Sequence, residues 1–242
     1  MDTSIYIALS RQIVQFNDMA MTANNIANLN TPGYNAQKLV FRQYLVDNGK
    51  TGGKDAYADA PTSYRNTTGG ATNVTNNPLD LALNGNAYFQ VETPLGTRFT
   101  KAGNFQLDAN GMIVNSNGYS LLGPDGSPIS LPPSTKKIEI NGAGQILADG
   151  SGVGQVGVME FENEQAMTRL GNSLYTSEET PQVSRTARVV QGAIESSNVN
   201  GVTELVRVME LSRSVGSTAK FIETMYDLER KSSTTLSQKK QS

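Results

Sequence analysis

A glycine-rich string is the first pattern in the sequence whose spacing could support chemistry. Gly152, Gly154 and Gly157 match the G-x-G-x-x-G spacing of dinucleotide-binding loops. Such a loop follows a buried strand and opens a helix, because the helix N-terminus binds the pyrophosphate. Here residues 148–151 are typical of a turn, and residues 156–161 alternate apolar and polar side chains as a strand does. We therefore expect no nucleotide site.

Carboxylates are the second group of side chains that could carry out a reaction or bind a metal ion. Three turn-like strings combine aspartate with glycine: Asp108-Ala-Asn110-Gly111, Asp125-Gly126 and Asp149-Gly150. None has the alternating oxygen ligands and final glutamate of an EF-hand calcium loop. The candidates for a hydrolytic carboxylate pair are Asp80, Asp108, Glu139 and Glu160. The sequence favours turn and strand-surface positions for them, so a carboxylate hydrolase is kept only as an alternative.

The amino-acid composition excludes further kinds of catalytic and metal-binding site. The 242 residues contain no cysteine and no histidine, so the chain has no thiolate nucleophile and lacks the commonest metal ligand and general base. Lys and Arg number 20 against 22 Asp and Glu, a net charge of -2 that does not attract nucleic acid. We expect no metal, no cofactor, no nucleic-acid partner and no enzymatic activity.

Asparagines gather where a predicted N-terminal helix ends. Asn24, Asn25 and Asn28 fall within five residues, although asparagine is a mediocre helix former. Each amide both donates and accepts hydrogen bonds, so the cluster can tie the helix end to neighbouring backbones in a crowded interface. Pro32 and Gly33 then predict a type II turn, with Gly33 at positive φ.

Apolar stripes at helical spacing bound the chain. In the N-terminal part the stripe steps by three and four residues through Leu9, Ile13, Phe16, Ala20, Ala23 and Ala27, broadened by Ile5 and Ile26. In the C-terminal part it runs through Val202, Leu205, Met209, Val215, Ala219, Ile222 and Tyr226. Asn200 is the expected N-cap of the second helix. Small residues in both stripes favour close packing of helix on helix.

In the middle of the chain, apolar and polar residues alternate with the two-residue period of a β-strand. Asn110-Gly111, Asn117-Gly118 and Asp125-Gly126 interrupt alternating residues and predict hairpin turns. We predict an α+β protein in which two amphipathic helices pair as a coiled-coil-like layer around an inserted all-β domain and a long extended connector. The expected parts are an N-terminal helix (1–30), a turn and connector (31–75), a β domain (76–182), a return segment (183–198) and a C-terminal helix and tail (199–242).

Neither a cleavable signal peptide nor a membrane span is expected. The first 18 residues have no basic region followed by an apolar core and a small-residue cleavage site. No run reaches the roughly 18 apolar residues that predict a spanning helix.

Four blocks in order resemble flagellar basal-body rod and hook proteins. They are Ala23-Asn-Asn-Ile-Ala-Asn28 with Thr31, Gly33 and Tyr34; residues 80–111, including Tyr88-Phe89-Gln-Val91; residues 156–175; and Glu195-Ser-Ser-Asn198-Val-Asn200 with Glu204-Leu205-Val206. The resemblance covers nearly the whole chain and is weakest over residues 47–75. Within the family the chain is most similar to proximal-rod members, with distal-rod members as the alternative.

The resemblance implies a structural subunit of a helical axial rod that crosses the periplasm. It implies contacts with further copies and other rod subunits, and export by the flagellar type III apparatus. The residues expected at the assembly interface are Leu9, Ile13, Phe16, Ala20, Ala23, Asn24, Asn25, Ile26, Ala27, Asn28, Asn198, Asn200, Leu205, Met209, Arg213, Ala219 and Ile222. Where many relatives have Gln-Arg-aromatic-Glu, this chain has Ser212-Arg213-Ser214-Val215-Gly216, which keeps only the arginine.

One alternative from another class stays open at this point. A secreted β-rich binding protein would pack both helices on its own β domain and leave a groove on the β surface. The terminal helices are rich in Ala, Ser, Thr and Asn, so they bury little apolar surface as an isolated pair. We therefore expect them to be largely disordered in the monomer and to fold when subunits dock.

Overall fold

The computed structural model describes residues 3–40, 43–47, 54–58 and 62–239. The chain divides into two compact units. The helical unit comprises the described residues of 1–27, 37–64 and 200–242, and the β unit comprises 28–36 and 65–199. The predicted α+β class, with paired terminal helices and an inserted β domain, is confirmed.

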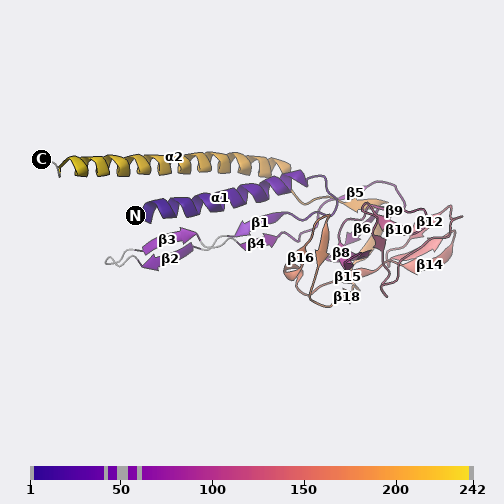
Figure 1. Cartoon of the computed structure of the whole chain (residues 1–242). Helices are drawn as coiled ribbons and strands as arrows, with labels where there is room; N and C mark the ends of the chain where they lie inside the picture. Colours follow the sequence, from indigo (N-terminus) through magenta and orange to yellow (C-terminus); the bar gives the residue numbers. More distant parts are fainter. Residues whose placement is uncertain (1–2, 41–42, 48–53, 59–61, 240–242) are drawn as a thin grey trace. The chain divides into compact units, whose positions relative to one another are not determined.

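Two antiparallel helices form the helical unit together with a pair of narrow β-ribbons. Helix α1 (Thr3–Ala27) has 25 residues and helix α2 (Gly201–Lys239) has 39, and they pack side by side (Figure 1). The Oδ1 atom of Asn200 accepts a hydrogen bond of 3.1 Å from the backbone N of Thr203, so Asn200 caps α2 as its position predicts. The predicted C-terminal tail includes residues 240–242, which lie outside the described residues.

The segment expected as an extended connector is extended, but most of its described residues are paired. Strand β1 (Gln37–Val40) pairs with β4 (Thr62–Arg65), and β2 (Gln43–Asp47) pairs with β3 (Lys54–Ala58) in antiparallel register. Strands β1 and β3 contact α1. Residues 48–53 and 59–61 of the expected connector lie outside the described residues.

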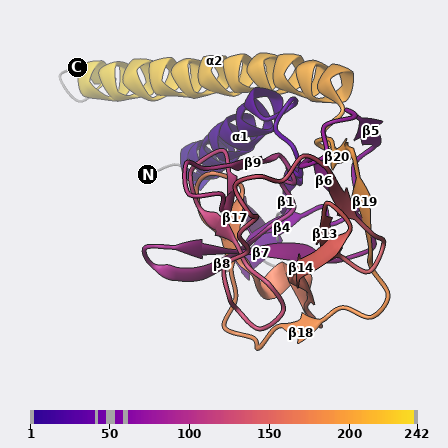
Figure 2. The same ribbon diagram turned by 90° about the vertical axis from the view of Figure 1, so that its right-hand side faces the viewer.

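A nine-stranded antiparallel sheet dominates the β unit. Its order is β16–β17–β8–β7–β11–β10–β9, and β15 pairs with both β7 and β18. These strands are β7 (Tyr88–Thr93), β8 (Gly96–Thr100), β9 (Phe105–Leu107), β10 (Ile113–Asn115), β11 (Ser120–Leu121), β15 (Val158–Glu160), β16 (Thr168–Arg169), β17 (Leu174–Thr176) and β18 (Gln182–Val183). Figure 2 shows the β7–β8 hairpin beside the other strands of the unit.

Three smaller sheets complete the β unit. Strands β12 (Ile138–Ile140), β13 (Gln145–Ala148) and β14 (Ser151–Gln155) form one of them. Strand β19 (Arg188–Gln191) pairs with β6 (Leu81–Asn84), and β20 (Ala193–Glu195) pairs with β5 (Thr72–Val74). Because β19 and β20 come from the expected return segment, this unit extends beyond the residues 76–182 expected for the β domain. A short 3₁₀ helix, η1 (Glu164–Ala166), lies between β15 and β16.

The predicted asparagine-glycine and aspartate-glycine turns are present, with a different geometry from a two-residue type I′ hairpin. Gly111, Gly118 and Gly126 have φ near +80°, whereas the residue before each glycine does not have positive φ. The backbone N of Gly111 donates to Asp108 O and that of Gly118 donates to Asn115 O. This pattern is typical of a turn followed by one left-handed residue, which joins β9 to β10 and β10 to β11.

Strand β7 separates two apolar clusters. Phe89 and Val91 enter a large cluster with Ile113, Leu121 and Ile146. Tyr88, the neighbour of Phe89, points to the opposite side and packs edge-to-face against aromatic rings of a second cluster. The strand alternation therefore gives the β unit a core on each side of its central strand.

The Phe89→Ala substitution tests this central position. Phe89 is fully buried and packs edge-to-face with Phe105, so its removal leaves a cavity. We expect a loss of about 3–5 kcal/mol in the free energy of unfolding of the β unit. Urea titration followed by tyrosine fluorescence measures it. The control, Leu95→Ala, removes a side chain that is 81% exposed and is expected to change stability little; equal effects of the two changes would contradict this core.

Alkaline pH tests the buried tyrosines. Burial raises the pKa of both Tyr88 and Tyr175 above the ordinary value for tyrosine. The unfolded chain therefore loses these protons first, at a pH of about 10, and above that pH the folded state loses stability by up to about 1.4 kcal/mol per pH unit for each tyrosine. Below pH 10 these two groups contribute no pH dependence.

Unfolding of Tyr88→Phe and of the unchanged chain at pH 9 and pH 11 measures the effect. We expect the unchanged chain to lose more stability than the variant between the two pH values. Identical losses would mean that Tyr88 ionises as easily in the folded state as in the unfolded chain.

Candidate assembly surface of the helical unit

The contact between α1 and α2 is largely polar. The most buried residues of α1 follow one helix face at three- and four-residue spacing: Ala8, Gln15, Asp18, Thr22 and Asn25. From α2, Glu204 and Thr218 are buried. We call the facing side chains of the two helices the polar seam.

Side-chain hydrogen bonds fix the register of the polar seam. Gln15 Nε2 donates to Ser214 Oγ over 2.6 Å, and Thr218 Oγ1 donates to Gln15 Oε1 over 3.3 Å. Arg207 Nη2 donates to both carboxylate oxygens of Asp18 over 3.0 Å. Sliding one helix along the other would leave these buried groups without partners, so polar contacts of this kind select a single alignment.

Asn25 explains part of the asparagine cluster. Its Nδ2 donates to Gln37 O over 2.8 Å and its Oδ1 accepts from Gln37 N over 3.0 Å, so the amide pairs with a backbone peptide where β1 begins. The same Nδ2 lies 3.4 Å from Glu204 Oε2 at the start of α2. One amide therefore joins the end of α1 to the returning chain and to the second helix, as expected of an amide in a crowded site.

The other two asparagines lie elsewhere. Asn24 is exposed, and Asn28 is half-buried at the start of the β unit, where its Oδ1 accepts from Thr31 Oγ1. The three asparagines of the cluster therefore lie in three different environments and do not form one site.

The predicted apolar stripe of α1 is not the face that meets α2. Leu9, Ile13 and Phe16 are 46%, 53% and 52% exposed, and the stripe continues through exposed Ala20, Ala23 and Ala27. Each step along a helix turns by about 100°, so Gln15 and Phe16 face different sides. Ile5 and Ile26, which broaden the stripe at its edge, are half-buried. We call Leu9, Ile13, Phe16, Ala20, Ala23 and Ala27 the apolar stripe.

The first turns of α2 carry a second exposed apolar surface. Leu205 and Met209 are 53% and 54% exposed, and Val202 and Val206 beside them are exposed as well. Arg213 and Ala219 are also exposed, whereas Ile222 is half-buried and lies one turn from Thr218 on the polar seam. Ser214, in the stretch that departs from the resemblance, contributes to the seam through Gln15.

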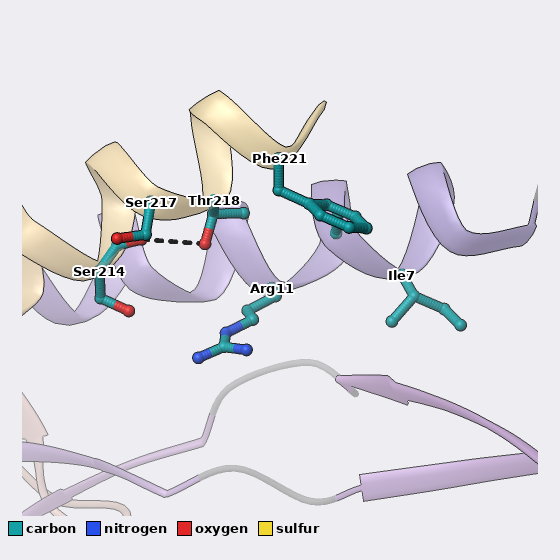
Figure 3. Close-up of a pocket in the computed structure, with 7 residues that line it drawn as sticks. Ile7, Arg11, Ser214, Ser217, Thr218 and Phe221 are labelled. Atoms are coloured by element: carbon teal, nitrogen blue, oxygen red, sulfur yellow. Dashed lines mark hydrogen bonds between the residues drawn. The ribbon is translucent and has the colours of Figure 1, made fainter. Parts of the chain in front are cut away.

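An open groove of about 470 Å³ lies between the two helices. Its lining consists of Ile7, Ala8, Arg11, Ser214, Ser217, Thr218 and Phe221, and Figure 3 shows how side chains of α1 and α2 surround it. The lining offers no carboxylate to pair with Arg11 and no set of convergent catalytic groups.

The remaining expected site residues belong to the β unit. Tyr34 N donates to Thr31 O over 3.3 Å, and Gly33 between them has φ +63°, so Pro32 and Gly33 occupy the two central positions of the predicted turn. Asn198 lies near this turn and donates its backbone N to Tyr34 O.

The residues considered for chemistry have structural contacts. Asp108 Oδ1 accepts from the backbone N of Asn110 and of Met112, and these bonds, chiefly that from Met112, lower the pKa of Asp108. Asp80 accepts from Asn77 Nδ2. Gly152 and Gly154 lie within strand β14, and the next element is strand β15 instead of a helix, so the phosphate-binding context is absent. Among the described residues, no group of three or more metal-ligating side chains could hold an ion.

Sequence reasoning missed the polar seam. Gln15, Asp18 and Thr22 lie at helical spacing with Asn25, which is a readable pattern, but polar residues at that spacing usually mark a solvent-facing side. Arg207, the partner of Asp18, and Thr218, the partner of Gln15, are 189 and 203 residues away in sequence. No helix in the described part of the chain has the length and apolar character needed to cross a membrane.

Family models match three parts of the chain. Residues 5–35 match the model described as flagella basal body rod protein. Residues 82–148 match the flagellar hook protein FlgE/F/G D1 domain, and residues 190–235 match the flagellar basal body rod FlgEFG protein C-terminal model.

Relatives with similar sequences span almost the full length of the chain. It is 31% identical to the flagellar basal-body rod protein FlgF of Mesorhizobium japonicum, over 90% of this chain and 91% of the relative. It is 33% identical to FlgF of Rhizobium meliloti, over 93% and 98%, and 28% identical to the rod protein FlgG of Bacillus subtilis, over 91% and 94%. With its paired terminal helices and inserted β unit, the chain belongs to the flagellar basal-body rod protein family.

Proposed function

We propose that this chain is a structural subunit of the proximal rod of the bacterial flagellum. It polymerises through its terminal helices with further copies of itself and with other rod subunits. The flagellar type III apparatus exports it without a cleavable signal peptide, and it works in the periplasmic part of the basal body. It has no catalytic role.

The exposed apolar stripe is the observation that carries this proposal. Within the helical unit, the polar seam already satisfies the buried polar groups of the α1–α2 contact. Leu9, Ile13 and Phe16 are about half exposed and recur on one side of α1. A contiguous apolar strip on a helix is typical of a contact with another chain.

The chemistry of the two faces fits stepwise assembly. A polar seam aligns α1 with α2, and a neighbouring subunit then buries the apolar stripe. Complete burial of one large apolar side chain contributes about 1.5–3 kcal/mol, and these side chains are already half covered, so each contact is modest. A contact between two different surfaces repeats from subunit to subunit without closing, which produces a helical assembly.

The proximal position is favoured over the distal rod by sequence similarity. FlgF relatives are 30–33% identical to the chain, and FlgG relatives are 28–30% identical, so the difference is small. Complementation distinguishes the two: we propose that the chain restores motility to a strain lacking its proximal-rod subunit but not to one lacking its distal-rod subunit. The alternative of a secreted binding protein predicts that neither strain recovers.

Substitution of Ile13 and Phe16 by serine tests the apolar stripe. Both side chains are exposed in the single chain, so the double change is expected to leave the β unit and its melting temperature unchanged. Assembly loses the apolar contacts, and we expect at least a tenfold decrease in the number of motile cells when the variant replaces the unchanged chain.

The matched control is Leu95→Ser, which alters an exposed apolar residue at the tip of the β7–β8 hairpin. It is expected to preserve motility. Normal motility of the Ile13 and Phe16 double variant, at equal protein level, would rule out the stripe as an assembly surface.

Asp18→Asn tests the polar seam. The change keeps the shape of the side chain but removes the charge that pairs with Arg207, and because the Arg207 side chain is 37% exposed, solvent screening limits the loss. We expect the pairing of α1 and α2 to lose about 1–2 kcal/mol. Hydrogen exchange of the α1 amides measures this loss. Asp227→Asn, an exposed change on α2, is the control, and equal exchange in the two variants would contradict the role of the Asp18–Arg207 pair.

A further inference from the structure

Three segments that are remote in sequence meet within the β unit. Residues 33–36 follow the turn after α1, residues 65–70 begin at the last residue of β4, and residues 195–198 precede α2. We call these three segments the junction. All of them belong to the β unit, and each lies next to a point where the chain passes between the two units, at residues 36/37, 64/65 and 199/200.

Asn198 is the hub of the junction. Its Oδ1 accepts from Ala36 N over 2.7 Å, and its Nδ2 donates to Asn66 O over 2.9 Å and to Thr68 O over 2.6 Å. Its backbone N donates to Tyr34 O over 3.2 Å. One amide thus contacts both other segments and uses its donor and acceptor atoms on backbone groups.

Backbone bonds reinforce the same meeting point. Gly33 N donates to Glu195 O over 2.8 Å, and Asn66 N donates to Ala36 O over 2.8 Å. Gly70 N donates to the carboxylate of Glu195 over 2.9 Å. A Cβ atom on Gly70 would lie 1.9 Å from the carbonyl oxygen of Ser196, so the segments approach too closely for any other residue there.

Arginine side chains anchor two of the segments on aromatic rings. The Arg65 guanidinium lies 4.4 Å from the ring centroid of buried Tyr175, and its backbone exchanges two hydrogen bonds with the amide of Gln165. The Arg169 guanidinium covers the ring of Tyr34 at 4.2 Å. These contacts connect the junction to the aromatic cluster of the β unit.

We infer that the junction is a single cooperative clamp, centred on Asn198, through which the β unit holds the three passages of the chain at 36/37, 64/65 and 199/200 at once. A force on one passage is shared by all three segments, because each hydrogen-bonds to the other two. This mechanical role follows from the contacts within the β unit and does not depend on the proposed rod function.

Hydrogen exchange in Asn198→Ala tests the clamp. Loss of the hub removes three side-chain bonds directly. If the clamp is cooperative, amides that Asn198 does not touch, those of Gly33 and Asn66, also exchange at least about tenfold faster. Amides of β7 and β10 in the core are expected to keep their protection.

Asn73→Ala is the matched control, because Asn73 donates its side-chain amide to Ser196 Oγ near the junction but on an exposed site. Its exchange at Gly33 and Asn66 is expected to equal that of the unchanged chain. Faster exchange at Ala36 alone in Asn198→Ala would overturn cooperativity and reduce Asn198 to a local contact.

A single-molecule pulling experiment provides a second readout, the force at which the chain extends. The chain has no cysteine, so handles attach only at introduced Val202→Cys and Leu95→Cys, both at exposed positions. We expect the otherwise unchanged chain to resist until the β unit itself unfolds. With Asn198→Ala added, an earlier release at lower force is expected, and identical force traces would overturn the proposal.

Discussion

The polar seam between the two helices is the constraint on which the rest of the molecule depends. The buried amide of Gln15 and the buried carboxylate of Asp18 on α1 gain their partners Ser214, Thr218 and Arg207 only when α2 lies alongside in one register. This contact fixes the alignment of the helices and adds little net stability. Its hydrogen bonds mainly replace those that the same polar groups make with water in the unfolded chain. The apolar side chains of the same helix are left on a different face, where a further subunit of the rod can cover them.

The β unit adds a second constraint of the same chemical kind. Asparagine amides act as substitute peptide groups at both places: Asn25 pairs with the backbone of Gln37, and Asn198 pairs with the backbones of Ala36, Asn66 and Thr68. Such contacts need close approach and fixed geometry, which an apolar side chain does not impose. The asparagine-rich motifs at both ends of the chain therefore define where segments meet, while the two apolar clusters around Tyr88 and Phe89 supply the stability of the β unit.

Local patterns predicted local structure well and long-range partners poorly. Helical spacing, the Asn200 cap and the glycine turns could be predicted, because each depends on neighbouring residues. The pairing of β19 with β6 and of β20 with β5 could not, since it joins segments about 100 residues apart. The apolar stripe was found, but periodicity cannot tell a contact within the chain from one between chains. The seam was missed because Gln15 and Asp18 resemble a solvated face until Ser214 and Arg207 are placed beside them.

Cysteine labelling at two adjacent residues of α1 tests the division between seam and stripe most directly. The chain contains no cysteine, Thr22 is buried in the seam and Ala23 is exposed on the stripe, so Thr22→Cys and Ala23→Cys are closely matched. We expect maleimide to label Ala23→Cys rapidly and Thr22→Cys slowly in the single chain, and both slowly in isolated basal bodies. Slow labelling of Ala23→Cys in the single chain, or rapid labelling of it in basal bodies, would contradict an apolar stripe reserved for neighbouring subunits.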